Sequence, residues 1–287
     1  MFAIGIDIGG TNTRIGLVSS EGALIEHKVI PTDKQLAPEE FLHHLIHECS
    51  PFIKQAQAIG IGIAGQSENG FLYFSPNLNW HQTPLTEIIG HRTKLPVIVE
   101  NDVRAALWGE WVCGAGKGYE DILFLSLGTG LGGAIVSGNR MVLGDRSAAG
   151  EIGHLCIDFH GRKCTCGAYG CLEAYVGGWA IRKEAEGLSP KEVFAKASQG
   201  DSRCADIVKD VVDALAAGVS SLLNVLNPRC VIFGGGIFVS HPELVERVKE
   251  GVVGRALAVE TESLVWKKQE IQHPGVIGSA LCAMKFL

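Results

Sequence analysis

The sequence lacks the features that define three large classes of protein. No part of its 287 residues approaches the roughly 18 uninterrupted apolar residues of a membrane-spanning helix. Its first residues run directly into a short apolar stretch, without the basic segment and cleavage site of a secretory signal peptide. Its net charge is −6, whereas a nucleic-acid-binding surface needs an excess of basic side chains. We therefore expect neither a membrane nor a nucleic acid as a partner.

Nine cysteines are present, but they lack the pattern of a secreted disulfide framework. Their total is odd, and Cys164, Cys166 and Cys171 are clustered in one short segment. A reducing, cytoplasmic location therefore fits better than a secreted one. We expect the remaining cysteines to pack as small apolar residues. These are Cys49, Cys113, Cys156, Cys204, Cys230 and Cys282.

Two parts of the chain repeat one order of elements. Each begins with an apolar stretch, continues through a glycine-rich turn and returns in a second apolar stretch. This pattern predicts two α/β units, residues 1–115 and 116–287, with a cleft between them. We also expect a C-terminal helix at about 275–287 that packs on the first unit. The predicted strands are Phe2–Ile8, Arg14–Val18, Leu24–Ile30, Ala58–Ala64, Val97–Glu100, Ile122–Leu127, Ala134–Ser137 and Cys230–Phe233. A long apolar helix face is predicted over Ile207–Leu226.

The glycine-rich turns have the composition of anion-binding loops. Glycine lets the backbone approach a ligand, and successive N–H groups in such a turn can surround a phosphate. Either turn alone could be an ordinary hairpin, but their matched positions favour ligand binding. Neither has the lysine of a P-loop, and neither opens a helix as a Rossmann turn does. The turn residues are Asp7, Gly9, Gly10 and Thr11, then Gly128, Thr129 and Gly130.

A third glycine run follows the predicted strand Cys230–Phe233. It contains Gly234, Gly235 and Gly236. The absence of side chains would let a nucleobase or ribose lie against the backbone. A plain connection between a strand and a helix is the alternative.

The segment from Glu151 to Glu173 concentrates potential metal ligands. Four side chains in it are of the types that a closed tetrahedral zinc site uses. The two glutamates flank these ligands, so a metal would fix both carboxylates for contact with a polar substrate. His160 lies in the same segment and competes with His154, which we favour because the neighbours of His160 predict an exposed turn. The favoured ligands are His154, Cys164, Cys166 and Cys171.

A candidate general base lies at the end of the strand Val97–Glu100. Asn101 and Asp102 follow this strand and precede a predicted helix. A carboxylate there can cap the helix, or it can accept a proton from a substrate hydroxyl. Phosphoryl transfer to an alcohol needs such a carboxylate. The local sequence alone leaves both roles open for Asp102.

Taken together, these motifs resemble the ROK family of sugar kinases. The resemblance covers nearly the whole chain and implies two actin-like, ribonuclease H-like ATPase domains of the hexokinase–actin–Hsp70 superfamily. The histidine and cysteine motifs are its most specific part. It is carried by Asp7–Thr11, Glu100–Asp102, Gly128–Gly130, Glu151–His154 and Cys164–Glu173.

The resemblance implies roles for the matching residues. Asp102 would be the base, and Asp7 would lie near Mg²⁺. His154 would contact the sugar with one ring nitrogen and a structural Zn²⁺ with the other, beside the three clustered cysteines. The other sugar ligands would be Asn101, Glu151 and Glu173. The ATP ligands would be Gly9, Gly10, Thr11, Gly128, Thr129 and Gly130 at the phosphates, and Gly234, Gly235 and Gly236 at the adenosine. Many relatives are dimers, which implies a homodimer.

The chain departs from the family pattern on the sugar side. Arg104 replaces a small residue or asparagine and would either reach the cleft or be solvated. Ala64 precedes Gly65 where proline is usual, and the family glycine before Trp80 is missing. The expected sugar contacts in this region are Gly65, Asn77 and Asn79.

The expected activity is ATP-dependent phosphorylation of a hexose, with glucose first. Fructose, mannose, N-acetylglucosamine and N-acetylmannosamine are the alternative substrates. A sugar-responsive regulator is a lesser alternative, because family repressors carry a DNA-binding domain in front of this core and little sequence precedes Asp7. A catalytically inactive sugar-binding module is a third alternative. The presence of Asp102 and of both glycine-rich turns disfavours it.

Overall fold

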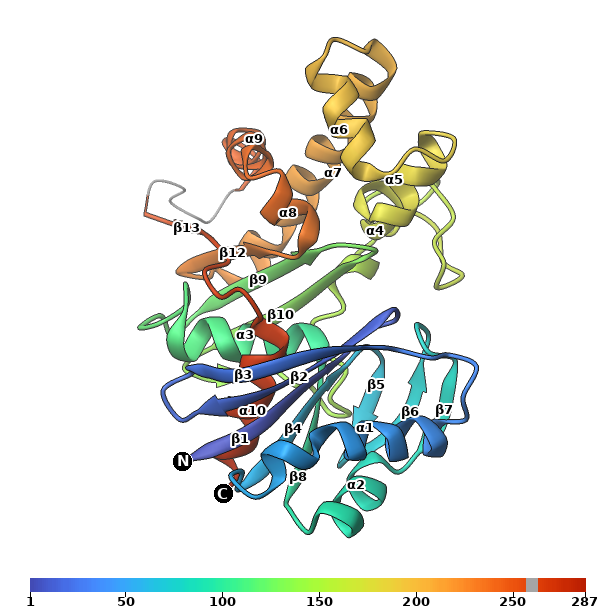
Figure 1. Ribbon diagram of the computed structural model, residues 1–287. Helices are drawn as coiled ribbons and strands as arrows, with labels where there is room; N and C mark the ends of the chain where they lie inside the picture. Colours follow the sequence, from blue (N-terminus) through green and yellow to red (C-terminus); the bar gives the residue numbers. More distant parts are fainter. Residues whose placement is uncertain (257–262) are drawn as a thin grey trace. The chain divides into compact units, whose positions relative to one another are not determined.

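A computed structural model describes residues 1–256 and 263–287, and the chain forms two units (Figure 1). Both chain termini lie in unit 1. No helix within the described residues is long and apolar enough to cross a membrane. Unit 1 consists of Met1–Gly118, Leu143–Ala149 and Glu270–Leu287. Unit 2 consists of Tyr119–Val142 and Gly150–Gln269.

The main sheet of unit 1 has five strands in the order β3-β2-β1-β4-β8. The first three are antiparallel neighbours, and β4 and β8 are added in parallel. The strands are β1 (Phe2–Ile8), β2 (Asn12–Ser19), β3 (Leu24–Pro31), β4 (Ala58–Ile63) and β8 (Val97–Asn101). A small second sheet contains β5 (Gln66–Glu68), β6 (Phe71–Ser75) and β7 (Trp80–Thr83). The helices are α1 (Pro38–Ile53), α2 (Leu85–Thr93), α3 (Asp102–Cys113) and α10 (Pro274–Lys285).

The sheet of unit 2 repeats this order as β11-β10-β9-β12-β13. Again the first three strands are antiparallel and the last two are added in parallel. The duplicated architecture predicted from the two glycine-rich turns is therefore confirmed. The strands are β9 (Ile122–Leu127), β10 (Leu131–Ser137), β11 (Arg140–Met141), β12 (Cys230–Gly234) and β13 (Val265–Lys268).

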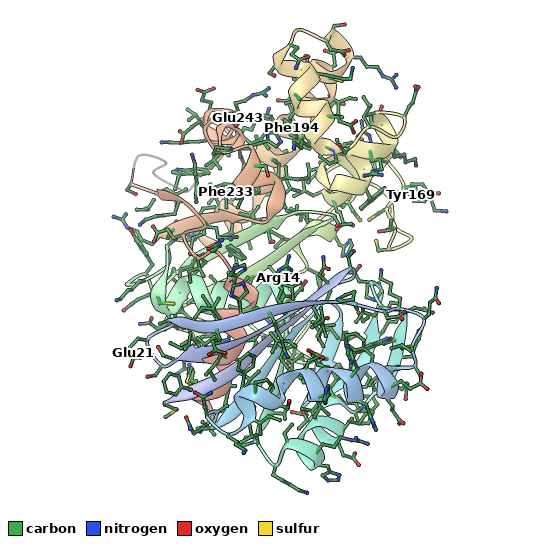
Figure 2. All side chains as sticks on the ribbon, in the orientation of Figure 1. Arg14, Glu21, Tyr169, Phe194, Phe233 and Glu243 are labelled. Carbon is green, nitrogen blue, oxygen red and sulfur yellow. The ribbon has the colours of Figure 1, made fainter. Side chains whose placement is uncertain are left out.

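Helices make up most of the rest of unit 2. The long helix α7 is capped by the Asp201 side chain, which accepts the Cys204 N–H, and it ends at Asn227 in a left-handed conformation. Its apolar face packs in one core with Phe233 of β12, which Figure 2 labels. The elements are η1 (Ile152–His154), α4 (Glu173–Val176), α5 (Gly178–Glu184), α6 (Pro190–Ser198), α7 (Ser202–Leu226), α8 (Gly236–Ser240) and α9 (Glu243–Val252).

The central strands of unit 1 alternate isoleucine with small residues. Successive side chains of a strand point to opposite faces, so the isoleucines of β1 and β4 share one face and pack with α1 and α2. Gly5 and Gly60 face α10 on the other side. A Cβ at Gly5 would overlap the carbonyl oxygen of Val276, and one at Gly60 would overlap that of Ser279. The helix therefore lies directly on the backbone of the sheet.

A buried carboxylate joins the end of α3 to the segment before α10. Glu110 is fully buried. It accepts hydrogen bonds from the backbone N–H groups of Ala115 at 2.8 Å, Ile271 at 2.8 Å and Glu270 at 3.1 Å. Buried N–H groups without acceptors are costly, so this side chain holds both segments in place.

One expectation about the cysteines is wrong. Cys49, Cys204, Cys230 and Cys282 are buried as expected, but Cys156 is exposed and Cys113 is only partly buried. Cys156 lies in a short irregular segment that has too little chain around it to cover every side chain.

The glycine contact with α10 predicts a specific loss of stability. In Gly60→Ala the new methyl group would force α10 away from the sheet, and we expect the free energy of unfolding to fall by about 3 kcal/mol. Chemical denaturation measures this change. Gly90→Ala in α2 is the matched control, because its nearest non-local atom is 3.6 Å away and alanine favours a helix. Equal unfolding midpoints for the two variants would contradict the proposed packing constraint.

Candidate active site

The first glycine turn connects β1 to β2 in unit 1. A hydrogen bond of 3.1 Å from the Gly9 N–H to the carbonyl of Asn12 closes it. Thr11 is exposed. A Cβ at Gly10 would lie 3.3 Å from Nζ of Lys34 and 3.5 Å from Cβ of Asn77. The turn thus combines backbone donors and a hydroxyl with a nearby ammonium group, which suits an anion.

Asp7 lies at the carboxyl end of β1, just before this turn. Its Oδ2 lies 3.7 Å from Nη1 of Arg14 on β2, which Figure 2 labels. Burial raises the pKa of the Asp7 carboxyl, and the positive charge of Arg14 partly offsets this effect. A carboxylate beside a phosphate-type turn has the oxygen donors that Mg²⁺ prefers, so the residue fits the expected metal.

Asn101, rather than Asp102, caps α3. The Asn101 Oδ1 accepts the N–H groups of Val103 at 3.0 Å and Arg104 at 3.2 Å. The sequence allowed Asp102 to be the residue that caps this helix, and that alternative is wrong. Asp102 occupies the first helical position, where its Oδ1 accepts the Val103 N–H at 2.9 Å. Its carboxylate therefore lies at the positive end of the helix dipole.

Arg104 is buried, so the alternative that its side chain is solvated is wrong. Its Nε donates to Oε1 of Glu100 at 2.6 Å, and its Nη1 donates to the carbonyl of Ser147 at 2.8 Å. The same Glu100 oxygen accepts the Asn101 N–H at 2.7 Å. Arg104 therefore stabilises the connection from β8 to α3 and holds the 143–149 segment of unit 1 against it.

The predicted sugar-side loops of unit 1 surround the small sheet. Gly65 has a φ of 132°, and a Cβ there would overlap the carbonyl of Phe74, so only glycine fits. Asn77 and Asn79 are exposed. The Asn79 Oδ1 lies 3.4 Å from Nε2 of His81. Both asparagines are therefore accessible to a ligand.

The second glycine turn connects β9 to β10 in unit 2. The Gly128 N–H donates to the Gly130 carbonyl at 2.9 Å, and Thr129 is exposed. The N–H groups of Gly178 and Trp179 donate to the carbonyls of Gly128 and Thr129, each at 3.0 Å. The start of α5 thus orients the backbone of this turn.

Glu173, at the start of α4, is held at both carboxylate oxygens. Oε2 accepts the Leu131 N–H at 2.9 Å, and Oε1 accepts Nε1–H of Trp179 at 3.1 Å. Glu151 directly precedes η1 and His154 is its last residue, and both are exposed. These three side chains, all in unit 2, can present two carboxylates and an imidazole to a polar ligand.

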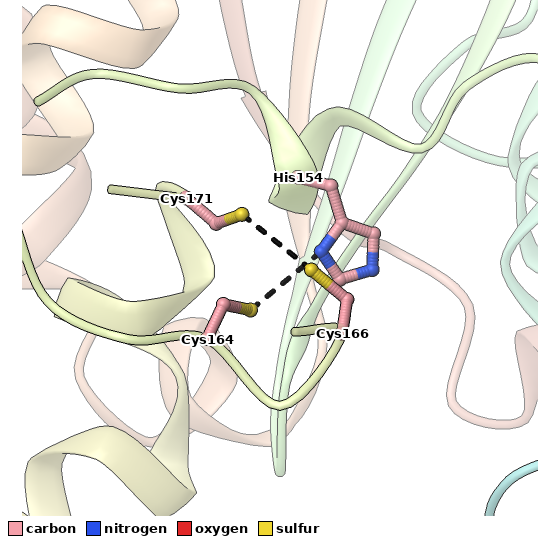
Figure 3. A group of neighbouring side chains, drawn as sticks. All are labelled: His154, Cys164, Cys166 and Cys171. Atoms are coloured by element: carbon pink, nitrogen blue, oxygen red, sulfur yellow. Dashed lines mark hydrogen bonds between the residues drawn. The ribbon is translucent and has the colours of Figure 1, made fainter. Parts of the chain in front are cut away.

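Four potential metal ligands converge on one point (Figure 3). Their ligand atoms all lie within 4.8 Å of one another. Cys166 Sγ lies 3.7 Å from Cys171 Sγ, and Cys164 Sγ lies 3.8 Å from Nδ1 of His154. Zinc–sulfur bonds of about 2.3 Å and zinc–nitrogen bonds of about 2.0 Å put tetrahedral ligand atoms roughly 3.5–3.8 Å apart. The group therefore fits zinc, and His160 is not part of it.

Two of these thiols differ in how readily they ionise. A backbone N–H of Ala168 faces Cys166 and lowers the pKa of that thiol, which favours the thiolate that a metal needs. Burial raises the pKa of the Cys171 thiol to about 12. A buried thiol of this kind ionises readily only when a cation is present to bind it.

The third glycine run connects β12 to the short helix α8. Gly235 has a φ of 84°, and its N–H donates to Oε1 of Gln269 at 3.1 Å. A Cβ at Gly235 would come within 2.6 Å of the Leu127 backbone, whereas Gly236 has open space around it. Gly235 is therefore needed for the fold, and Gly236 leaves room for a ligand.

Sequence analysis missed two residues beside these groups. Lys34 follows a strand in an exposed loop, and nothing in its local sequence signals that it lies near Gly10. Trp179 follows two glycines, and only the hydrogen bond to Glu173 reveals its importance. Both depend on contacts between segments that are distant in the sequence.

Comparison with known proteins identifies the family. The ROK family pattern matches residues 3–285. A glucokinase of Thermotoga maritima is 35% identical over 96% of this chain and 95% of its own length. An N-acetylmannosamine kinase of Escherichia coli O157:H7 is 32% identical over 83% of this chain and 84% of its own.

Solved structures agree with this result. A ROK hexokinase from Thermus thermophilus has a TM-score of 0.90 and 29% identity, with 100% of this chain and 99% of that chain covered. A ROK family glucokinase from Streptomyces griseus, in complex with glucose and AMPPNP, has a TM-score of 0.85 and 28% identity. The match covers 99% of this chain and 100% of that chain. The chain therefore belongs to the ROK family, and it is a sugar kinase of the hexokinase and actin-like fold.

Proposed function

We propose that this sugar kinase transfers the γ-phosphoryl group of ATP to glucose, giving glucose 6-phosphate. The observation that carries the proposal is Asp102, a carboxylate at the first position of α3, in a chain with a phosphate-type glycine turn in each of two equivalent sheets. The names of the similar proteins, with glucose and AMPPNP bound to one of them, support this sugar and this donor. N-acetylmannosamine is the main alternative substrate, because a kinase for it is nearly as similar.

Each group of residues has a proposed part in binding. Asp7 would hold Mg²⁺, which neutralises charge on the phosphates when it is bound. The sugar would be bound by Asn101, Glu151, His154, Glu173, Gly65, Asn77 and Asn79. The phosphates would be bound by Gly9, Gly10, Thr11, Gly128, Thr129 and Gly130. The adenosine would lie along Gly234, Gly235 and Gly236.

The proton chemistry rests on Asp102. As the sugar hydroxyl oxygen forms its bond to the γ-phosphorus, the bond from that phosphorus to the bridging oxygen of ADP breaks. Asp102 accepts the hydroxyl proton, so no positive charge builds up on the attacking oxygen. The Val103 N–H holds the carboxylate in one orientation, and the cap made by Asn101 fixes the helix that carries it.

The zinc has a structural role in this proposal. His154 and the three cysteines supply four ligands, which leaves no open position for activating water. The metal would fix the ring of His154 and hold the chain on either side of it, with Glu151 before and Glu173 after.

Removing the charge of Asp102 should separate binding from chemistry. In Asp102→Asn we expect the turnover number to fall by at least about 100-fold, because the base is lost. The dissociation constant for glucose, measured by calorimetry, should change less than about threefold, because the side chain keeps its shape. Asp206→Asn on the exposed face of α7 is the control. Turnover near that of the wild type in Asp102→Asn would show that another group takes the proton.

A panel of sugars tests the substrate. We expect kcat/KM for glucose to exceed that for fructose, mannose, N-acetylglucosamine and N-acetylmannosamine by at least about tenfold, because a site built to bond a hydroxyl rejects analogues that leave it unpaired. A coupled assay of ADP release measures each value. A higher value for N-acetylmannosamine would reassign the substrate, and no ADP release with any sugar would favour a regulatory role.

Metal analysis tests the zinc site. We expect one zinc ion per purified wild-type chain and no zinc in Cys166→Ser. In that variant the KM for sugar should rise about tenfold or more, because His154 loses its support. Cys156→Ser is the matched control, because Cys156 lies in the same segment but outside the group of four metal ligands, and its thiol donates to the Tyr169 carbonyl at 3.7 Å. A folded, active wild-type protein without zinc would rule out this role.

A further inference from the structure

Trp179 makes two hydrogen bonds within unit 2 that connect different segments. Its indole Nε1–H donates to Oε1 of Glu173 at 3.1 Å. Its backbone N–H donates to the carbonyl of Thr129 in the second glycine turn at 3.0 Å. One residue therefore bonds both a proposed sugar ligand and a proposed phosphate-binding turn.

The backbone around Trp179 is built for this position. A Cβ at Gly177 would lie 3.3 Å from the indole nitrogen and 2.9 Å from the Glu173 carbonyl, and a Cβ at Gly178 would lie 2.6 Å from the Gly128 carbonyl. Larger residues at these two glycines would push α5 away from the turn. The paired glycines thus let the indole reach the carboxylate while the backbone stays bonded to the turn.

The carboxylate of Glu173 completes the connection. Its second oxygen accepts the N–H of Leu131, the residue that directly follows the turn. A Cβ at Gly130 would overlap that oxygen, so the turn and the carboxylate are in direct contact. With one donor on each oxygen, the carboxylate plane cannot rotate without breaking a hydrogen bond, and the remaining lone pairs have a fixed direction.

We propose that Trp179 is a positioning residue for sugar binding and acts through Glu173. This inference rests on the proposed role of Glu173 as a ligand for a sugar hydroxyl. Without the indole N–H, Oε1 of Glu173 would lose its hydrogen-bond donor. Binding of the sugar would then have to order the Glu173 side chain, which would weaken the binding. The bonds of the backbone to the glycine turn would remain, so binding of ATP should be unaffected.

Trp179→Phe tests this role, because it removes the donor and keeps an aromatic ring. We expect the KM for glucose to rise about tenfold, the usual effect of losing one hydrogen bond to a charged group. The KM for ATP, the zinc content and the unfolding midpoint should match the wild type. Trp266→Phe is the matched control. The buried indole nitrogen of Trp266 has no hydrogen-bond partner in the described part of the chain, and its ring stacks on Phe233, a contact that a phenyl ring can also make.

A double-mutant cycle with Glu173→Gln separates positioning from simple packing. The Leu131 and Trp179 donors lie on different carboxylate oxygens, and a glutamine replaces one of these oxygens with an amino group that cannot accept. One anchor is therefore already lost in that background, and Trp179→Phe should change the KM for glucose less than about twofold there. An unchanged KM in the single variant, or the same tenfold rise in both backgrounds, would overturn the positioning role. A wild-type protein that phosphorylates no sugar would instead overturn the proposed function and, with it, this role.

Discussion

The contact of α10 with the sheet backbone is the constraint on which unit 1 depends. This helix comes from the far end of the chain, yet it packs on β1, on β4 and on α3. At the glycines no side chain separates the two surfaces, because a Cβ at Gly278 would overlap the Ala105 carbonyl just as one at Gly60 would overlap the Ser279 carbonyl. β1 ends at the first glycine turn and α3 begins with Asp102. Close contact with this one helix therefore constrains both the strand that leads to the first glycine turn and the helix that carries the proposed base.

Unit 2 positions its polar residues by a different means. Between β11 and α4 the only described helix is the three-residue η1, so Glu151 and His154 are carried by a single helical turn. Ile152 and Leu172 join the main core of unit 2, whereas the cysteines lie in a small separate cluster of Cys164, Cys171 and Ala174. A metal ion can replace a hydrophobic core where a segment is this short. The carboxylate of Glu173 then links the segment to β10 through a single hydrogen bond to Leu131.

Much of this arrangement was predictable from periodicity and motifs. Alternation and glycine spacing identified both hairpins, the strand before Asn101 and the helix ending at Asn227, because these signals are local. The small sheet β5-β6-β7 was missed, since its strands are three to five residues long and contain exposed aromatic residues. The cap at Asn101, the buried Arg104 and the role of Trp179 could not be predicted. Each depends on a hydrogen bond whose geometry, or whose partner in a distant segment, the sequence does not reveal.

The cap of α3 also determines what Asn101 can recognise. An asparagine amide ordinarily offers a ligand both an acceptor and two donors. Here its oxygen already accepts two backbone N–H groups, which leaves the amino group as the part available to a ligand. A hydroxyl bound to Asn101 must then supply a lone pair, and its own hydrogen is free to point elsewhere. The residue next in the chain is Asp102, an acceptor. The fold thus gives this part of the proposed site a polarity, with a donor and an acceptor on adjacent residues.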